Sequence, residues 1–183
     1  MKKAYIFLAE GFEEVEALTA VDILRRAGVN AVTVSISGDN EVTGSHRIPV
    51  VADCVFGDIK NDEADLLVLP GGMPGATNLR AHKGLCSLLK KQAEDGKLVS
   101  AICASPAVVL GPVGLLKGHA ATCYPGMEGT LDCDETVTDR PVVVSGNVVT
   151  SRGPATAMDF ALSLTELLCG TEVKEKIAAG LLR

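Results

Sequence analysis

Residues 97–117 read K-LVSAICASPAVVLGPVGLL-K, a stretch of nineteen uncharged residues between two lysines. Its length would permit a membrane-spanning helix. Internal serine, proline and glycine residues, however, interrupt both its apolarity and its helical continuity. The pattern instead predicts a buried strand over 98–102, a turn at Cys103, and a buried helix from about Ala104 with Pro106 in its first turn. We therefore expect a soluble α/β core and no membrane span.

Strand and helix signals alternate on both sides of this stretch. Residues 65–69 (DLLVL) form a second continuous apolar run, as expected of a central parallel strand, and they end at Pro70-Gly71-Gly72. The remaining predicted strands cover 3–8 and 30–36, with short β segments within 38–58 and near 119–123, 135–139, 142–145 and 147–150. The predicted helices cover 13–27, 81–95, 154–168 and 172–179. This alternation predicts an α/β sandwich with a mostly parallel central sheet.

Composition limits the classes of function. The chain has 183 residues, of which 47% are apolar and 22% charged, so we expect one globular domain over 1–183. The net charge of −6 would repel a phosphate backbone, and only six aromatic residues could stack on bases, so no nucleic-acid partner is expected. The N-terminus has six apolar residues before Glu10, too few for a secretory signal, so we expect a cytoplasmic protein.

Metal, disulfide and nucleotide signatures are missing from the sequence. The six cysteines contain no C-x-x-C pair, and the three histidines (His46, His82 and His119) are scattered without ligand spacing. There is no Walker or dinucleotide-binding motif either. We therefore predict no metal and no cofactor, and we expect most cysteines to be reduced and buried.

Three candidate segments should meet at one edge of the sheet, because ligands of open α/β sheets bind beyond the carboxyl ends of the strands. These segments are residues 10–16, Gly71-Gly72 and Cys103. Cys103 lies between a strand and a helix start, where backbone N–H groups favour a thiolate and lower the thiol pKa. The alternative is an inert, buried structural cysteine.

The neighbouring groups each allow two interpretations. The backbone N–H groups of Gly72 and Ala104 could stabilise an oxyanion, although glycine pairs also serve ordinary turns. Glu16 lies about one helical turn after Glu13. Acidic residues are common at helix starts for electrostatic reasons alone, so pattern by itself favours a solvated Glu16 over a catalytic one.

Four segments together resemble the ThiJ/PfpI superfamily, and most closely the branch of the Parkinsonism-associated protein deglycase. They are residues 11–16 (GFEEVE), 69–72 (LPGG), 101–104 (AICA) and 150–154 (TSRGP), and they occur in order along nearly the whole chain. The resemblance implies a flavodoxin-like three-layer sandwich that forms a homodimer.

The resemblance also implies roles for individual residues. Cys103 becomes an easily oxidised nucleophile, and a protonated Glu16 donates a hydrogen bond to its thiolate. The implied oxyanion site comprises the N–H groups of Gly72 and Ala104; the implied pocket residues are Gly71, Tyr124, Ser151 and Arg152; and the implied dimer interface contains Asp22, Arg25 and Arg26.

The sequence departs from this family at Tyr124, in the segment ATCYP (121–125), where several relatives have a histidine. A phenol ordinarily ionises near pH 10 and is a poor general base at neutral pH. Amidase or protease activity is therefore not expected. Cys123 could act as a resolving thiol for Cys103, but a buried structural cysteine is the more common case.

Two functions follow as hypotheses. In the first, Cys103 and Glu16 act without a cofactor on small reactive carbonyls, as in a glyoxalase or deglycase. In the second, the protein is a redox sensor or a chaperone-like protein in which an oxidant converts Cys103 to sulfinic acid. A role in thiazole-phosphate synthesis, a historical label of the family, has no support because no phosphate-binding motif is present.

Overall fold

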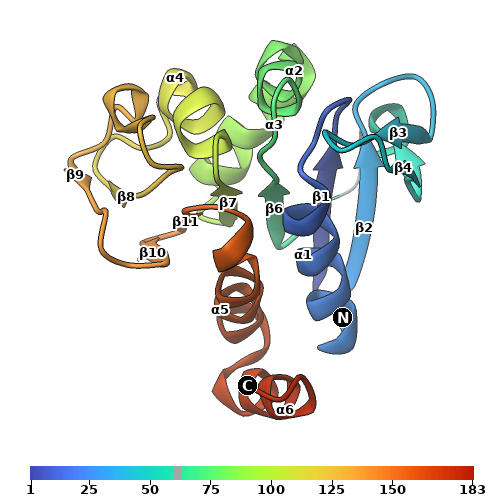
Figure 1. Cartoon of the computed structure of the whole chain (residues 1–183), viewed down its shortest axis with the longest axis vertical. Coiled ribbons are helices and arrows are strands. Elements are labelled where there is room, and N and C mark those ends of the chain that lie inside the picture. The colour runs from blue at the N-terminus through green and yellow to red at the C-terminus, as the bar shows by residue number, and fades with distance from the viewer. Residues whose placement is uncertain (60–62) are drawn as a thin grey trace.

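The computed structural model describes residues 1–59 and 63–183 and is built around a seven-stranded sheet (Figure 1). Its strand order is β10-β11-β7-β6-β1-β2-β5, and every neighbouring pair is parallel except β10 with β11. The strands are β1 (Lys3–Leu8), β2 (Asn30–Ser35), β5 (Cys54–Val55), β6 (Leu66–Leu69), β7 (Leu98–Ile102), β10 (Val142–Ser145) and β11 (Val148–Ser151). The predicted α/β sandwich with a mostly parallel sheet is confirmed.

Helices cover both faces of this sheet. Strand β1 illustrates why, because alternate side chains of a strand point to opposite faces. Ile6 packs in one core cluster with residues of α1 and α5, whereas Phe7 packs in the other with residues of α2 and α3. The helices are α1 (Glu14–Arg26), α2 (Gly75–Ala81), α3 (Lys83–Glu94), α4 (Gly111–Val113), α5 (Ala157–Cys169) and α6 (Thr171–Gly180). The last of these, α6, packs against α5 (Figure 1).

Two helices differ from the sequence prediction. The helix expected over 81–95 is α3, but a separate helix, α2, precedes it, and the His82 side chain accepts a hydrogen bond from Leu85 N–H at the start of α3. The helix expected after Cys103 is short. It comprises a π-helical segment over Pro106–Leu110 followed by α4, and it ends at Gly114, which has a left-handed φ of +85°.

Smaller elements lie outside the main sheet. Strands β3 (Glu41–Thr43) and β4 (Pro49–Val51), which lie where short β segments were predicted within 38–58, form an antiparallel hairpin, and β8 (Ala120–Ala121) pairs with β9 (Glu135–Thr136). Short 3-10 segments cover Phe56–Ile59, Glu128–Thr130 and Pro154–Thr156. Among the described residues, the helices are all too short or too polar to cross a bilayer.

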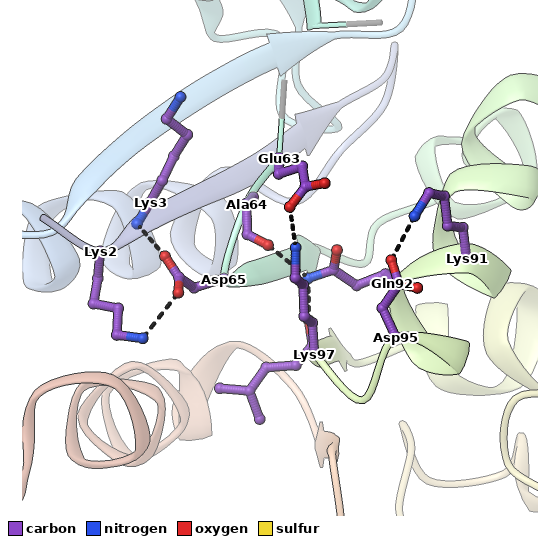
Figure 2. Close-up of polar contacts among 10 residues, drawn as sticks. Lys2, Lys3, Glu63, Ala64, Asp65, Lys91, Gln92, Asp95 and Lys97 are labelled. Atoms are coloured by element: carbon purple, nitrogen blue, oxygen red, sulfur yellow. Dashed lines mark hydrogen bonds and ion pairs between the residues drawn. The ribbon is translucent and has the colours of Figure 1, made fainter. Parts of the chain in front are cut away.

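A polar network ties together the starts of β1, β6 and β7, at the edge opposite the strands' carboxyl ends (Figure 2). Asp65 accepts hydrogen bonds from the Lys2 side chain and the Lys3 backbone, both at 2.9 Å. The buried Gln92 side chain donates to the carbonyl oxygens of Ala64 at 3.1 Å and Leu98 at 3.3 Å. These contacts fix the strand starts, and the functional residues gather at the other edge.

Candidate active site

Cys103 follows directly after β7 and has a left-handed backbone, with φ of +65°. A non-glycine residue in this region is uncommon and persists where neighbouring contacts hold it. Here Cys103 N–H donates to the Ser151 carbonyl at 3.0 Å, and the Cys103 carbonyl accepts from Tyr124 N–H at 2.8 Å. Cys103 is 9% exposed. The sharp turn expected at this residue is thus present, and the chain on both sides holds it.

Glu16 comes from α1 and is fully buried. Its Oε2 accepts a hydrogen bond from Gly71 N–H at 2.7 Å, and its carboxyl also interacts with the Cys103 side chain. Oε1 has no hydrogen-bond partner among the described residues. Burial raises the pKa of Glu16 to about 7, because the hydrogen bonds from Gly71 and Cys103 only partly offset the cost of a buried charge. Glu16 is therefore not the solvated residue that the pattern alone favoured.

The pKa of the Cys103 thiol shifts in the direction opposite to the sequence prediction. Burial and the adjacent Glu16 carboxylate raise it to about 12, although hydrogen bonds from the backbone N–H groups of Gly72 and Ala104 act to lower it. The lowered thiol pKa was predicted from the helix start alone, and burial of the sulfur and the negative charge of Glu16 outweigh the effect of the helix start. Both groups of the pair hold a proton more tightly than usual, because two adjacent negative charges are unfavourable. When the shared proton moves to Glu16, the sulfur becomes a thiolate facing two N–H groups.

Glycine is required at positions 71 and 72, just after β6, because neighbouring atoms leave no room for a Cβ atom. A Cβ on Gly71 would lie 2.6 Å from the Cys103 Cβ and 2.8 Å from Glu16 Oε2. Gly72 has φ of +88°, and a Cβ there would lie 2.5 Å from Glu13 N. These glycines therefore let α1, the end of β6 and the Cys103 turn approach one another.

A cleft of about 820 Å³ opens over the sulfur. Of the residues predicted for the site, Cys103, Gly72, Ala104 and Tyr124 line it, and Tyr124 is half exposed. The other lining side chains are mostly apolar, and no Lys or Arg side chain lines the cleft in the part of the chain that the structure describes. The cleft thus suits a small ligand that carries no negative charge.

Ser151 and Arg152 do not line this cleft. The Ser151 hydroxyl is buried and donates to the Pro141 carbonyl at 2.8 Å, so Ser151 serves the site through its backbone bond to Cys103. Arg152 lines a second, smaller hollow of about 250 Å³, which shares Tyr124 and Pro154 with the main cleft. The prediction that both residues border the reactive pocket therefore needs correction, because their side chains are directed elsewhere.

The residues predicted for a dimer interface lie on the surface side of α1. Arg26 forms an ion pair with Asp22 at 2.7 Å, and Arg25 forms one with Asp53 at 2.6 Å. All four side chains are partly exposed. Their role in dimerisation stays a prediction.

A polar cluster at the cleft was missed in the sequence. His46 lies between β3 and β4, and its Nδ1 is 2.9 Å from Glu14 Oε2 and 3.6 Å from Glu13 Oε2. All three residues line the cleft. Burial opposes the charge of Glu14, but hydrogen bonds from His46 and Ser45 outweigh it and lower the pKa of Glu14 to about 2. The hydrogen bond that His46 donates to Glu14 and the negative charge of Glu13 raise the pKa of His46.

The ligand atoms of Glu13, Glu14 and His46 lie within 4.8 Å of one another, a spacing that could hold a metal ion. The Glu14 carboxylate and the imidazole already share a hydrogen bond, and the Ser45 hydroxyl donates within the cluster. His46 is more than thirty residues from the two glutamates, so no local spacing signal could have revealed the cluster.

Cys123 is buried, and burial raises the pKa of its thiol to about 11. Its sulfur lies 3.4 Å from the Tyr124 carbonyl oxygen, to which it can donate. This is the environment of a structural cysteine. A resolving role toward Cys103 stays a prediction.

Comparison with known proteins gives matches along nearly the whole chain. A solved structure described as oxidized Toxoplasma gondii DJ-1 superposes with a TM-score of 0.96 and is 41% identical, covering 100% of this chain and 98% of that one. Glutathione-independent glyoxalase DJR-1.2 of Caenorhabditis elegans is 34% identical over 93% of this chain and 91% of its own length.

Protein DJ-1 homolog B of Arabidopsis thaliana is 43% identical over 90% of this chain. The match covers only 37% of that longer protein. The family described as DJ-1/PfpI matches residues 2–167. Because this family match covers most of the chain and the relatives align with nearly all of it, the chain belongs to the DJ-1/PfpI family.

Proposed function

We propose that the protein converts small α-oxoaldehydes, such as glyoxal and methylglyoxal, into hydroxy acids without a cofactor. The observation that carries this proposal is the buried pair of Glu16 and Cys103, with two backbone N–H groups at the sulfur and an open cleft above it. The C. elegans relative named as a glutathione-independent glyoxalase supports the same reaction class.

The first step is addition of the sulfur to the aldehyde carbon. Cys103 passes its proton to Glu16 as the S–C bond forms, so an unfavourable pair of adjacent anions never arises. The carbonyl oxygen becomes an oxyanion, which the N–H groups of Gly72 and Ala104 stabilise. Glu16 then returns the proton to that oxygen, and a hemithioacetal is formed.

The second step is an isomerisation. Glu16 removes the C–H proton of the hemithioacetal to give an enediol and returns that proton to the neighbouring carbon. The hydroxyl proton of the first carbon moves to the oxygen of the second. The first carbon is oxidised to a thioester and the second is reduced to an alcohol, so no external redox cofactor is needed. A pKa of about 7 suits Glu16 to both proton transfers. Hydrolysis of the thioester then releases the hydroxy acid.

The assembly and location that we propose follow from the family resemblance. The protein would act as a cytoplasmic homodimer, with Asp22, Arg25 and Arg26 near the interface. The partly exposed ion pairs of these residues leave them available for such a contact. Sedimentation of the purified chain would test the dimer, and a monomer at micromolar concentration would contradict it.

The proposal is tested by incubating the purified protein with methylglyoxal and following lactate formation. We expect turnover by the native protein, loss of at least about a hundredfold in Cys103→Ser and Glu16→Gln, and native rates in the control Cys86→Ser. Absence of lactate with native protein whose Cys103 is intact would overturn the proposal.

A second candidate function is redox sensing. Glu16 and the N–H groups of Gly72 and Ala104 surround the sulfur and could hold the oxygens of a sulfinic acid. The oxidized Toxoplasma relative supports this possibility. Peptide mass spectrometry after limiting peroxide would test it. Selective oxidation of Cys103 is expected, whereas equal oxidation of all six cysteines would contradict it.

A further inference from the structure

An acid–imidazole pair lines the cleft that contains Cys103. The Glu14 carboxylate receives two hydrogen bonds from His46, one from its backbone N–H at 2.8 Å and one at ring Nδ1 at 2.9 Å. A carboxylate at Nδ1 selects the tautomer that carries its proton there. Ring nitrogen Nε2, which has no hydrogen-bond partner among the described residues, is then available to accept a proton.

Glu14 is well placed to hold the ring in this orientation. It is 4% exposed, and its Oε2 also lies 3.2 Å from the Ser45 hydroxyl. The turn that carries His46 is shaped around this carboxylate, because a Cβ on Gly44 would overlap the Glu14 side chain. The hairpin β3–β4 is thereby attached to the start of α1, the helix that also carries Glu16.

The proposed reaction needs a base on the cleft side of the sulfur. Glu16 is fully buried, hydrogen-bonded to Gly71 N–H and not part of the cleft lining, so it is not placed to activate a water molecule that enters from the cleft. The ionisable side chains that line the cleft are Cys103, Glu13, Glu14, Tyr124 and His46. Of these, Glu14 is committed to His46, and Glu13 accepts from Ser45 at 3.1 Å. His46 is 68% exposed in its side chain and so meets water directly.

We propose that His46 is the general base that activates water for hydrolysis of the Cys103 thioester, and that Glu14 is its positioning residue. This inference rests on the proposed function. His46 Nε2 takes a proton from water as the water oxygen bonds to the thioester carbon. The resulting oxyanion lies against the Gly72 and Ala104 N–H groups. It collapses with cleavage of the C–S bond, whose electron pair stays on sulfur, and the acid leaves as His46 releases its proton to solvent.

The charged neighbours of His46 define a pH signature for this step. Glu14, the first residue of α1, and Glu13, which precedes it, face the ring, and both favour its protonated form. The neutral, basic form therefore predominates only at higher pH, and hydrolysis should slow as the pH falls through the raised pKa of His46. Replacement of Glu14 by Gln removes the largest cause of that shift, so the acidic limb of the rate profile should move to lower pH.

The test uses the full chain with methylglyoxal, rapid quenching and intact mass spectrometry. In His46→Gln we expect one equivalent of acyl adduct on Cys103, rapid consumption of one equivalent of methylglyoxal, and steady lactate release slowed by about a hundredfold or more. Added imidazole should restore hydrolysis in His46→Ala. Arg47→Gln is the matched control, because Arg47 lies exposed in the same turn and is not part of the cleft lining.

The outcomes separate the two proposals. If His46→Gln turns over at the native rate without an adduct, and Glu14→Gln leaves the acidic limb where it was, His46 only stabilises the hairpin and the inference is wrong. If the native protein and every variant form neither adduct nor lactate, the proposed function itself fails and this inference falls with it. If His46→Gln does not fold, the shift of the acidic limb in Glu14→Gln decides the question.

Discussion

The Glu16 carboxyl and the Cys103 sulfur lie beside Gly71 and interact with each other through a hydrogen bond. A Cβ placed on Gly71 would be 2.8 Å from Glu16 Oε2 and 3.0 Å from the sulfur. Both groups are buried and both have raised pKa values, so neither ionises independently of the other. The reactivity of the sulfur is therefore a property of the pair.

Gly71→Ala should separate the pair. The new methyl group would push apart Glu16 and Cys103, with loss of at least about tenfold in the alkylation rate of Cys103 at neutral pH and destabilisation by about 1–3 kcal/mol from overpacking. Gly38→Ala is the matched control, because nothing lies within 4 Å of a Cβ there. Alkylation measured by peptide mass spectrometry and unfolding in urea check both effects. Equal alkylation rates in the two variants would contradict the geometry.

Glu16→Gln should stabilise the fold above neutral pH. The folded pKa of Glu16, about 7, lies above its ordinary value of 4.5. Its protonation therefore stabilises the fold fully below pH 4.5, and this contribution is lost as the pH rises through 7. Ionisation of the buried carboxyl therefore lowers the free energy of unfolding by about 3 kcal/mol. A neutral Gln cannot ionise, so the variant does not lose this stability. The free energy of unfolding of Glu16→Gln, taken relative to that of the native protein, should accordingly increase between pH 5 and pH 8. A constant difference over this range would show that Glu16 is not buried as described.

Glu14→Gln should have the opposite pH dependence. The folded pKa of Glu14, about 2, lies below its ordinary value of 4.5. Its ionised form therefore stabilises the fold above pH 4.5, and this contribution is lost as the pH falls through 2. Acid titration of unfolding should show native protein more stable than Glu14→Gln at neutral pH and the two converging near pH 2. Parallel curves would argue against the His46–Glu14 contact.

Gln92→Leu should lower stability without changing reactivity. The substitution removes the side-chain donor that joins the carbonyl oxygens of Ala64 and Leu98; the bond to Ala64 is buried (Figure 2) and the bond to Leu98 is partly buried. We expect a loss of about 1–3 kcal/mol in the free energy of unfolding and an unchanged alkylation rate of Cys103. Lys90→Ala, an exposed change on the same helix, is the control. A change in Cys103 reactivity would show that the two edges of the sheet are coupled.

Much of the fold could be predicted because central parallel strands are buried on both faces and read as continuous apolar runs. The runs at 66–69 and 98–102 are of this kind, and both end where the site begins. Helix α2 was missed because Pro74 and Gly75 look like loop residues, although Pro74 precedes the helix and Gly75 opens it.

The site was predictable only in part. Cys103 follows from the end of a buried strand, but the direction of its pKa shift depends on a carboxyl group 87 positions away in the chain. The residues close to Cys103 in the sequence do not indicate which distant side chain packs against its sulfur. The contribution of His46 likewise depends on how the β3–β4 hairpin folds back on α1.

The most direct test of the central claim is the alkylation rate of Cys103 against pH, in the native protein and in Glu16→Gln. The shared proton predicts a native rate that rises through about pH 7 and then levels, because loss of the first proton from the pair lets thiolate form. In Glu16→Gln this step should vanish, and the rate should rise only at higher pH. A single inflection near the ordinary thiol value of about 8.5 in both proteins would contradict the account.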